Sequence, residues 1–454
     1  MRQHRFLSPL FLPVYSFAAT IFVGAVILYL DISQNVAVTQ GKLAFVDALF
    51  TATSAVCVTG LTVVDTGSVY SRFGQWVVLA LIQLGGLGIM TYSSLIFYLW
   101  RHRVSLVDKL AVGQALMHDP SFHLGRFLLR LVRTILCIEL GCAVLLYWSD
   151  PQGMGVFGAL FHAVSAFCNA GFGLKPDNMV GWRDNAGINL VIMFLIVSGG
   201  IGFSVMDELL GVARKRVAGV QHRPLSRHTR LVLTTSFFLI MAGAAAIWVA
   251  EYCSAYTGLT PAGLVLPALF QSVTCRTAGF NTLDIAAMTD FSLMSMICLM
   301  FIGGSPGSCA GGIKTTSYRV LAGFVGAQLR GRRQNVLLGR AVDGPTLSKA
   351  LTLFLFATLA VLWGTMVLSV TEGGFAPHAQ GRFEMLDLLF EVTSAFGTVG
   401  LTTGVTPLLS VPGKLTITLL MFVGRIGPLW LLTSLQQLQQ EPKFRWPEGE
   451  FPIG

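Results

Sequence analysis

The sequence predicts an all-α membrane protein built from four pseudo-symmetric repeats, each consisting of a helix, a re-entrant loop and a second helix. Three observations support this fold class. Of the 454 residues, 54% are hydrophobic and only 12% are charged, whereas soluble domains carry about 25% charged residues. The apolar residues gather in long uncharged runs. In addition, a short pattern that ends on glycine occurs four times along the chain.

The apolar runs predict the membrane helices. Most of them approach the roughly 20 residues that cross a hydrocarbon core. The clear runs are 13–30, 76–99, 134–147, 188–206, 231–250, 350–370 and 415–424. A further run, 291–302, is shorter and stops at a glycine-rich break, so we count it as an interrupted span. The first run has no small-residue cleavage site, and we therefore predict a membrane helix there and not a cleaved signal.

Basic residues predict the orientation in the membrane. The formal net charge is +9, and segments 101–133, 207–230 and 319–349 hold six Lys or Arg residues each, while the connections between them hold one or two. This distribution follows the positive-inside rule and places both termini and the three basic loops in the cytoplasm. Topology, together with contact with anionic lipids of the bilayer, explains the positive charge, so a nucleic-acid partner is not expected.

Each outer connection carries the repeated pattern. Leu-Phe is followed four residues after the Phe by Ser or Thr, and then by a closing glycine. The copies are residues 48–62, 159–173, 268–281 and 389–403, and they close on Gly60, Gly171, Gly279 and Gly400. The third copy is one residue shorter between Phe and Gly. Glycine-rich segments recur in the following helices as LGGLGIM, SGGIGFS, GGSPGSCAGGIKT and GRIGPLW.

This internal repetition decides the predicted architecture. We expect eight transmembrane helices around one central pore. The repeats are predicted at 1–100, 101–211, 212–330 and 331–454, and the last ends in a short cytoplasmic tail. Tight turns or helix packing could explain one such glycine, but neither requires four copies in register.

The four re-entrant loops have the features of a carbonyl-lined cation filter. In each, a short pore helix would begin at the Phe and direct the partial negative charge of its C-terminal end toward the cavity. The residues after it would present carbonyl groups that replace the hydration shell of K⁺, and glycine takes the φ > 0 that this turn requires. We assign the coordinating carbonyls to Val58, Thr59, Gly60, Asn169, Ala170, Gly171, Thr277, Ala278, Gly279, Thr398, Val399 and Gly400.

These motifs resemble those of the Trk/Ktr/HKT superfamily of K⁺ transporters. The segments SAVCVTGLT, TCRTAGFN and GSPGSCAGGIKTT carry the resemblance, which covers essentially the whole chain. The KtrB-type membrane subunit fits best, because one helix precedes Gly60, whereas Trk-type subunits usually have two more. Plant relatives that favour Na⁺ often have Ser at the place of Gly60, so the resemblance implies K⁺ selectivity. The GYG signature of K⁺ channels is missing, which is compatible with looser selectivity.

Segment 303–316 interrupts a span at membrane depth. Its five Gly and one Pro in 14 residues cannot hold a regular helix. A simple kink is the alternative, but five glycines and a lysine exceed what a kink needs. The resemblance implies a flexible loop that acts as a gate under the filter. The residues assigned to the gate are Gly303, Gly304, Pro306, Gly307, Gly311, Gly312, Lys314 and Arg425.

Arg425 carries a charge within an apolar helix. Such a charge costs about 2.5–3.5 kcal/mol on insertion scales and needs a partner. Facing the pore, Arg425 would repel K⁺ and donate hydrogen bonds to free carbonyl groups of the loop, which matches the pattern of the family. Snorkelling to the surface is the alternative. For Lys314, a cytoplasmic position and a role in the gate stay equally open.

No cofactor is expected, and K⁺ is the only metal ion expected to bind. No GxGxxG or P-loop motif follows a predicted strand. The resemblance therefore implies a separate cytoplasmic nucleotide-binding subunit of the KtrA type, a homodimer of this chain, and a place in the bacterial inner membrane. Na⁺-coupled symport is compatible with the family, although no residue indicates it.

Other function classes are a Trk-type K⁺ or K⁺/Na⁺ transport subunit, a simple gated cation channel, and a membrane enzyme. An enzyme would need His, Asp or Glu to converge within the spans. We expect the acidic residues and His222, His228 and His378 at span ends or in loops, and we expect His162 to pack within the second pore helix. The sequence therefore disfavours an enzyme.

Overall fold

The computed structural model describes residues 12–35, 43–87, 124–220, 224–254, 260–374 and 382–427. Within these ranges the chain is helical, apart from connecting segments and one short antiparallel hairpin of β1 (Val336–Leu337) and β2 (Arg340–Ala341). Some predictions fall outside the described residues: the end of the run 76–99, most of the basic segment 101–133, His222, His378 and the C-terminal tail.

The described helices range from 4 residues in α4 to 30 residues in α16. The helices of the first half are α1 (Leu12–Tyr29), α3 (Phe45–Val56), α4 (Thr66–Val69), α5 (Arg72–Gly86), α8 (Leu124–Ser149), α9 (Pro151–Phe167), α10 (Ala186–Gly200) and α11 (Phe203–Val217). Those of the second half are α12 (Arg227–Ser254), α13 (Pro261–Thr274), α14 (Asp290–Phe301), α15 (Thr315–Leu329), α16 (Gly344–Gly373), α17 (Met385–Gly397) and α18 (Val411–Ile426). Single 3₁₀ turns lie at Asp31–Ser33, Val180–Trp182, Ile285–Ala287 and Thr406–Leu408.

Helices form at each predicted apolar run, with one difference. The run 188–206 is not one straight helix, because α10 ends at Gly200 and α11 continues at an angle of 111°. Gly202, with φ of 96°, makes the break. By length and apolarity, α12 and α16 can each cross a membrane among the described residues, and the bent pair α10 and α11 would add a third span. The count of eight membrane spans stays a prediction.

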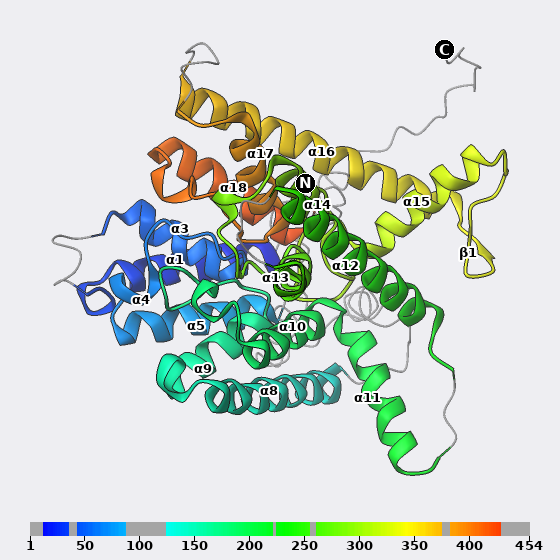
Figure 1. Cartoon of the computed structure of the whole chain (residues 1–454), viewed down its shortest axis with the longest axis horizontal. Helices are drawn as coiled ribbons and strands as arrows, with labels where there is room; N and C mark the ends of the chain where they lie inside the picture. Colours follow the sequence, from blue (N-terminus) through cyan, green and yellow to red (C-terminus); the bar gives the residue numbers. More distant parts are fainter. Residues whose placement is uncertain are drawn as a thin grey trace, which may run out of the picture.

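The helices pack in a closed cycle that follows the order of the chain (Figure 1). Helix α5 packs against α9, α10 against α13, α14 against α17, and α18 returns to α3. In Figure 1 the colours accordingly run around the molecule from blue through green to orange. An ion pair of 2.7 Å between Lys414 Nζ on α18 and Asp47 Oδ1 on α3 joins the two ends of the cycle.

The core lies around the four helices that carry the repeated pattern, which are called the short helices below: α3, α9, α13 and α17. The phenylalanine of each repeated pattern is fully buried: Phe50, Phe161, Phe270 and Phe390. Large apolar side chains on α8, α12 and α16 are instead exposed, such as Trp148, Phe237 and Leu359. This reversal of the usual burial pattern is expected of helices whose outer surface faces lipid.

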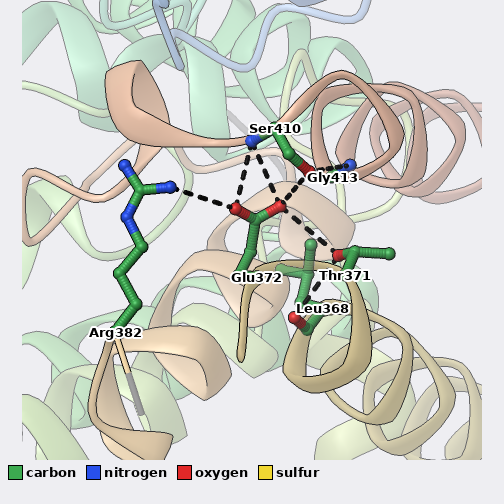
Figure 2. A network of polar contacts seen from close by, with 6 residues as sticks. All are labelled: Leu368, Thr371, Glu372, Arg382, Ser410 and Gly413. Atoms are coloured by element: carbon green, nitrogen blue, oxygen red, sulfur yellow. Dashed lines mark hydrogen bonds and ion pairs between the residues drawn. The ribbon is translucent and has the colours of Figure 1, made fainter. Parts of the chain in front are cut away.

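In the last two units, a buried glutamate joins the two helices that flank the short helix. Glu372, near the end of α16, accepts hydrogen bonds from the backbone nitrogen (3.0 Å) and the hydroxyl (2.6 Å) of Ser410, which begins α18 (Figure 2). Arg382 lies 3.8 Å from the same carboxylate. On α12, Glu251 accepts the matching bonds from the backbone nitrogen (3.1 Å) and hydroxyl (3.0 Å) of Thr289, which begins α14.

The two glutamates occupy the same place in their units. Each lies 28 residues before the closing glycine, from 251 to 279 and from 372 to 400. The capped residues Thr289 and Ser410 each lie 10 residues after it. The same arrangement of helices thus recurs in the last two units, down to the side chains that fasten them.

A different contact fastens the second unit. Asp150, between α8 and α9, caps α9 by accepting from Gly153 N at 2.8 Å. Its other oxygen accepts from Trp182 Nε1 at 2.7 Å. These two hydrogen bonds, the one from Trp182 first, hold the pKa of the Asp150 carboxyl below its usual value.

Candidate cation pathway

Each short helix ends just before one of the predicted filter segments. The backbone then turns through positive φ at the residue two places before the closing glycine: Val58 (56°), Asn169 (60°), Thr277 (73°) and Thr398 (50°). The closing glycines also have positive φ, between 69° and 98°. A non-glycine residue in this region carries a strain of about 1–3 kcal/mol, and such strain concentrates at functional sites. Four strained turns in matching positions therefore mark these segments as a candidate site.

The closing glycines form a ring in chain order. A Cβ atom added to Gly60 would lie 2.5 Å from the carbonyl oxygen of Ala170, and one added to Gly171 would lie 2.8 Å from that of Ala278. A Cβ atom on Gly279 would clash with the carbonyl oxygen of Val399.

The ring closes between the last unit and the first. A Cβ atom on Gly400 would clash with the carbonyl oxygen of Thr59. Each glycine thus faces the carbonyl of the residue that precedes the next glycine. At the four closing glycines no side chain fits between neighbouring segments.

Hydroxyl groups of the short helices support these segments from behind. The backbone nitrogens of Gly60 and Gly400 donate to Ser54 Oγ and Ser394 Oγ, both at 3.0 Å. In the second unit Ser165 Oγ instead donates to the carbonyl of Phe172 at 2.9 Å. The segments are therefore held in different ways.

The third segment has one residue fewer than the others, and the difference lies in the turn that follows its short helix. In the first unit Thr59 N donates to the carbonyl five residues before it, in Ser54, at 2.8 Å. In the third, Ala278 N donates to the carbonyl four residues before it, in Thr274, at 2.9 Å. The turn is shorter by one residue, and the ring of glycines is preserved.

The predicted gate segment lies against the filter and against the break between α10 and α11. Ser305 N and Cys309 N donate to the carbonyls of Gly200 (3.0 Å) and Gly199 (3.2 Å). The carbonyl of Gly307 accepts from Phe203 N at 2.9 Å. These bonds satisfy backbone groups that a broken helix leaves free.

Glycines allow the loop to reach the filter. A Cβ atom on Gly311 would clash with Thr398 Oγ1 and lie 2.8 Å from the carbonyl oxygen of Gly397. Gly303 lies against the backbone of Gly311 in the same way. The loop thus comes directly under the fourth filter segment. Gly312 has positive φ (64°).

Arg425 is buried and contacts the loop, as its sequence position suggested. One guanidinium nitrogen donates to the carbonyl of Cys309, and another donates to the carbonyl of Gly85 on α5 at 2.5 Å. No carboxylate among the described residues pairs with it. Arg425 therefore links three units through backbone carbonyls. Lys314 makes a related bond within the loop, from Nζ to the carbonyl of Ala310 at 2.6 Å.

The position of Arg425 is occupied by glycine in the first and second units. Gly85, Gly199 and Gly424 each pack against the carbonyl oxygen of the short helix of their own unit, in Val56, Phe167 and Phe396. The next residue is Gly86, Gly200 or, in the fourth unit, Arg425. The sequence carries this signal, since Gly424-Arg425 aligns with the glycine pairs of these two units.

Two buried acids contradict the expectation that acidic residues lie at span ends or in loops. Glu139 is buried in the middle of α8 and accepts from Gln83 Nε2 at 3.3 Å. Glu391 is buried in α17 and accepts from the hydroxyls of Thr402 and Thr406, the latter at 2.6 Å. Both stand in apolar surroundings because hydrogen-bond donors from distant segments reach them.

His162 is buried in α9, as expected. Its Nδ1 lies 2.8 Å from the carbonyl of Gly158, and its ring packs edge-on against Phe161 and Trp182. Among the described residues, no group of three His, Cys, Asp or Glu side chains could hold a metal ion.

The comparison with known families matches this geometry. The family model of TrkH, described as a cation transport protein, matches residues 16–444. The chain belongs to the TrkH family of cation transport proteins. Its fold supports this membership: the crystal structure of the potassium transporter TrkH from Vibrio parahaemolyticus superimposes with a TM-score of 0.69, covering 96% of this chain and 85% of that one, at 19% identity.

Relatives within the family match along their whole length. The Ktr system potassium uptake protein B of Bacillus subtilis is 39% identical over 99% of this chain and 97% of its own length. The potassium/sodium uptake protein NtpJ of Enterococcus hirae is 34% identical over 100% of this chain and 99% of its own. These matches confirm the predicted membership in the Trk/Ktr superfamily, and this TrkH-family chain is a multi-pass membrane transporter and not an enzyme.

Proposed function

We propose that this chain is the K⁺-conducting membrane subunit of a Ktr-type uptake system. The ring formed by Gly60, Gly171, Gly279 and Gly400 carries the proposal. Because the four segments approach so closely, their carbonyl groups can replace the hydration shell of one dehydrated cation. The twelve filter residues coordinate K⁺ through their backbones, in a pore built from four repeats and eight membrane helices.

Gating takes place under the filter. The loop 303–316 lies between the filter and the break in the second unit, and Arg425 holds it through the carbonyl of Cys309. A guanidinium at this place repels K⁺ and keeps the loop closed. Opening requires both bonds of Arg425 to break. Backbone acceptors favour such a change, because they hold the arginine less firmly than a buried carboxylate would.

Control comes from other polypeptides. Relatives are named as proteins of the Ktr system, and the sequence predicts no nucleotide-binding motif in this chain. We infer that a cytoplasmic nucleotide-binding subunit of the KtrA type contacts the basic loops. We also infer that the chain forms a homodimer in the bacterial inner membrane with both termini in the cytoplasm.

Na⁺ is the second candidate as transported or coupling ion, since NtpJ is named for potassium and sodium uptake. Uptake of K⁺ and of Na⁺ by a K⁺-uptake-deficient bacterial strain that expresses the chain, with and without a KtrA-type subunit, tests the proposal. We expect growth at low K⁺ and K⁺ uptake that the subunit increases. Equal uptake of both ions would favour a non-selective cation channel. No K⁺ uptake from a chain that reaches the membrane would overturn the proposal.

A further inference from the structure

The strongest unassigned feature is the carboxyl group of Glu139. It lies in the middle of α8 with 1% of its surface exposed. No cation among the described residues pairs with it. An ionisable group at this depth is costly, and a leucine would fill the same space without this cost. The carboxyl group therefore requires an explanation that packing does not give.

Glu139 belongs to a small polar cluster with Gln83 and Cys168. Gln83 Nε2, on α5, donates to Glu139 Oε2 at 3.3 Å. The thiol of Cys168 lies 3.7 Å from Gln83 Oε1 and 4.0 Å from Glu139 Oε1. The cluster thus connects α5, α8 and the end of α9.

The four filter segments are called walls below and are numbered in chain order, so Asn169, Ala170 and Gly171 form the second wall. Cys168 places the cluster directly behind this second wall. It caps α9 and immediately precedes Asn169, the first residue of that wall, whose φ is positive. Its side chain also fills the space next to Gly86 on α5, where a Cβ atom would lie 2.8 Å from that of Cys168. A shift of the cluster would therefore move the turn that leads into the second wall.

The second wall is supported differently from the first and fourth walls. In those walls a serine hydroxyl accepts from the nitrogen of the closing glycine, Gly60 or Gly400. In the second wall Ser165 is engaged with the carbonyl of Phe172 instead. The end of this wall is held by Ser165 and by Asn178 Nδ2, which donates to the carbonyl of Gly171 at 3.2 Å. The cluster of Glu139, Gln83 and Cys168 lies at its start.

We propose that Glu139 is a positioning residue for ion selectivity. Its oxygen holds the Gln83 amide, which with the Cys168 thiol fixes the turn at Asn169 and so the direction of the second-wall carbonyls. What is required is an acceptor oxygen. This inference rests on the proposed K⁺ filter and adds a residue of a different helix to it.

The test compares variants that keep or remove the acceptor. Glu139→Gln keeps an oxygen for Gln83, whereas Glu139→Leu removes it. The ratio of K⁺ to Na⁺ uptake is measured in the deficient strain, together with the amount of protein in the membrane. We expect Glu139→Gln to stay within about twofold of the native ratio and Glu139→Leu to lower it about tenfold, because carbonyl orientation sets selectivity. Cys142→Ala, in the same core of α8, is the control and keeps the native ratio.

Three outcomes would overturn the inference. A native ratio in Glu139→Leu overturns the inference, and so does an equal loss in Glu139→Gln, which would assign the effect to charge. If Glu139→Leu does not reach the membrane, Cys168→Ala replaces it, and a native ratio in that variant overturns the inference equally. A native chain that does not prefer K⁺ would refute the proposed function itself, and is therefore distinguishable from these outcomes.

Discussion

In the candidate pathway, single residues are important because of the space that their side chains leave free or fill. The closing glycines are required both by their positive φ and by the backbone of the neighbouring unit. Arg425 has the opposite property, because it introduces a large charged side chain where the first and second units have glycine. The proposed pathway thus has four small residues in its filter and one large residue under it.

Replacing a closing glycine should reduce selectivity. In Gly60→Ser the new Cβ would meet the carbonyl of Ala170 at 2.5 Å, at a φ of 98° that serine rarely adopts. We expect the ratio of K⁺ to Na⁺ uptake to fall about tenfold, since the displaced carbonyls no longer match K⁺. Gly141→Ala on α8 is a matched control, because no atom lies within 4 Å of the added Cβ. An unchanged ratio in Gly60→Ser would contradict the assignment of the filter.

Removing the Arg425 side chain should open the pathway. Arg425→Ala loses the bonds to Cys309 and Gly85 and the charge under the filter. We expect K⁺ uptake to rise several-fold, at unchanged protein in the membrane. Arg425→Lys keeps the charge but cannot hold both carbonyls in the same planar geometry, so an intermediate rate is expected. A rate in Arg425→Ala equal to the native rate would argue against this gate.

At the scale of elements, the sequence pattern agrees best with the structure where a local feature, such as the repeated glycine, determines the backbone. The four short helices end just before the closing glycines, as predicted, but each begins five to ten residues before the Phe at which it was predicted to begin. The contacts of the glutamates near the ends of α12 and α16 could not be predicted from the sequence. Glu372 and Ser410 are 38 residues apart, and no periodicity connects them. The bend at Gly202 was not predicted, because the run 188–206 is uncharged and glycines within such a run do not by themselves require a break.

The contacts of Glu372 predict a stabilising role. In Glu372→Ala the backbone nitrogen and hydroxyl of Ser410 lose their buried acceptor (Figure 2), which costs about 1–3 kcal/mol. We expect a lower thermal unfolding temperature in detergent. Glu372→Gln keeps one acceptor oxygen and should lose less. If both variants unfold at the native temperature, the network of Figure 2 does not contribute to stability.

At the scale of the whole molecule, the ends of the cycle meet through few charged groups. Lys414 on α18 and Asp47 on α3 are both largely buried and 2.7 Å apart. Their separation of 367 residues in sequence explains why sequence reasoning did not pair them. The same holds for Arg425 and Gly85, which are 340 residues apart. Neither contact follows from a local sequence pattern, because each joins the first unit to the last.

A charge reversal tests the closure of the cycle. Lys414→Glu places two carboxylates at short distance, which should lower thermal stability and the amount of folded protein. Combining it with Asp47→Lys restores an opposite pair and should recover most of the loss. The measurement is the unfolding temperature of each single variant and of the double variant. Additive losses in the double variant would mean that the two side chains do not interact.

The last contact of the glycine ring, from Gly400 to Thr59, determines when a complete pathway can exist during synthesis. A ribosome delivers the first three walls to the bilayer well before the fourth. Until α17 and α18 have been inserted, the carbonyl of Thr59 has no neighbour on one side, and the nascent chain is an open three-sided structure. The ring of glycines is therefore complete only when the final quarter of the polypeptide is in place.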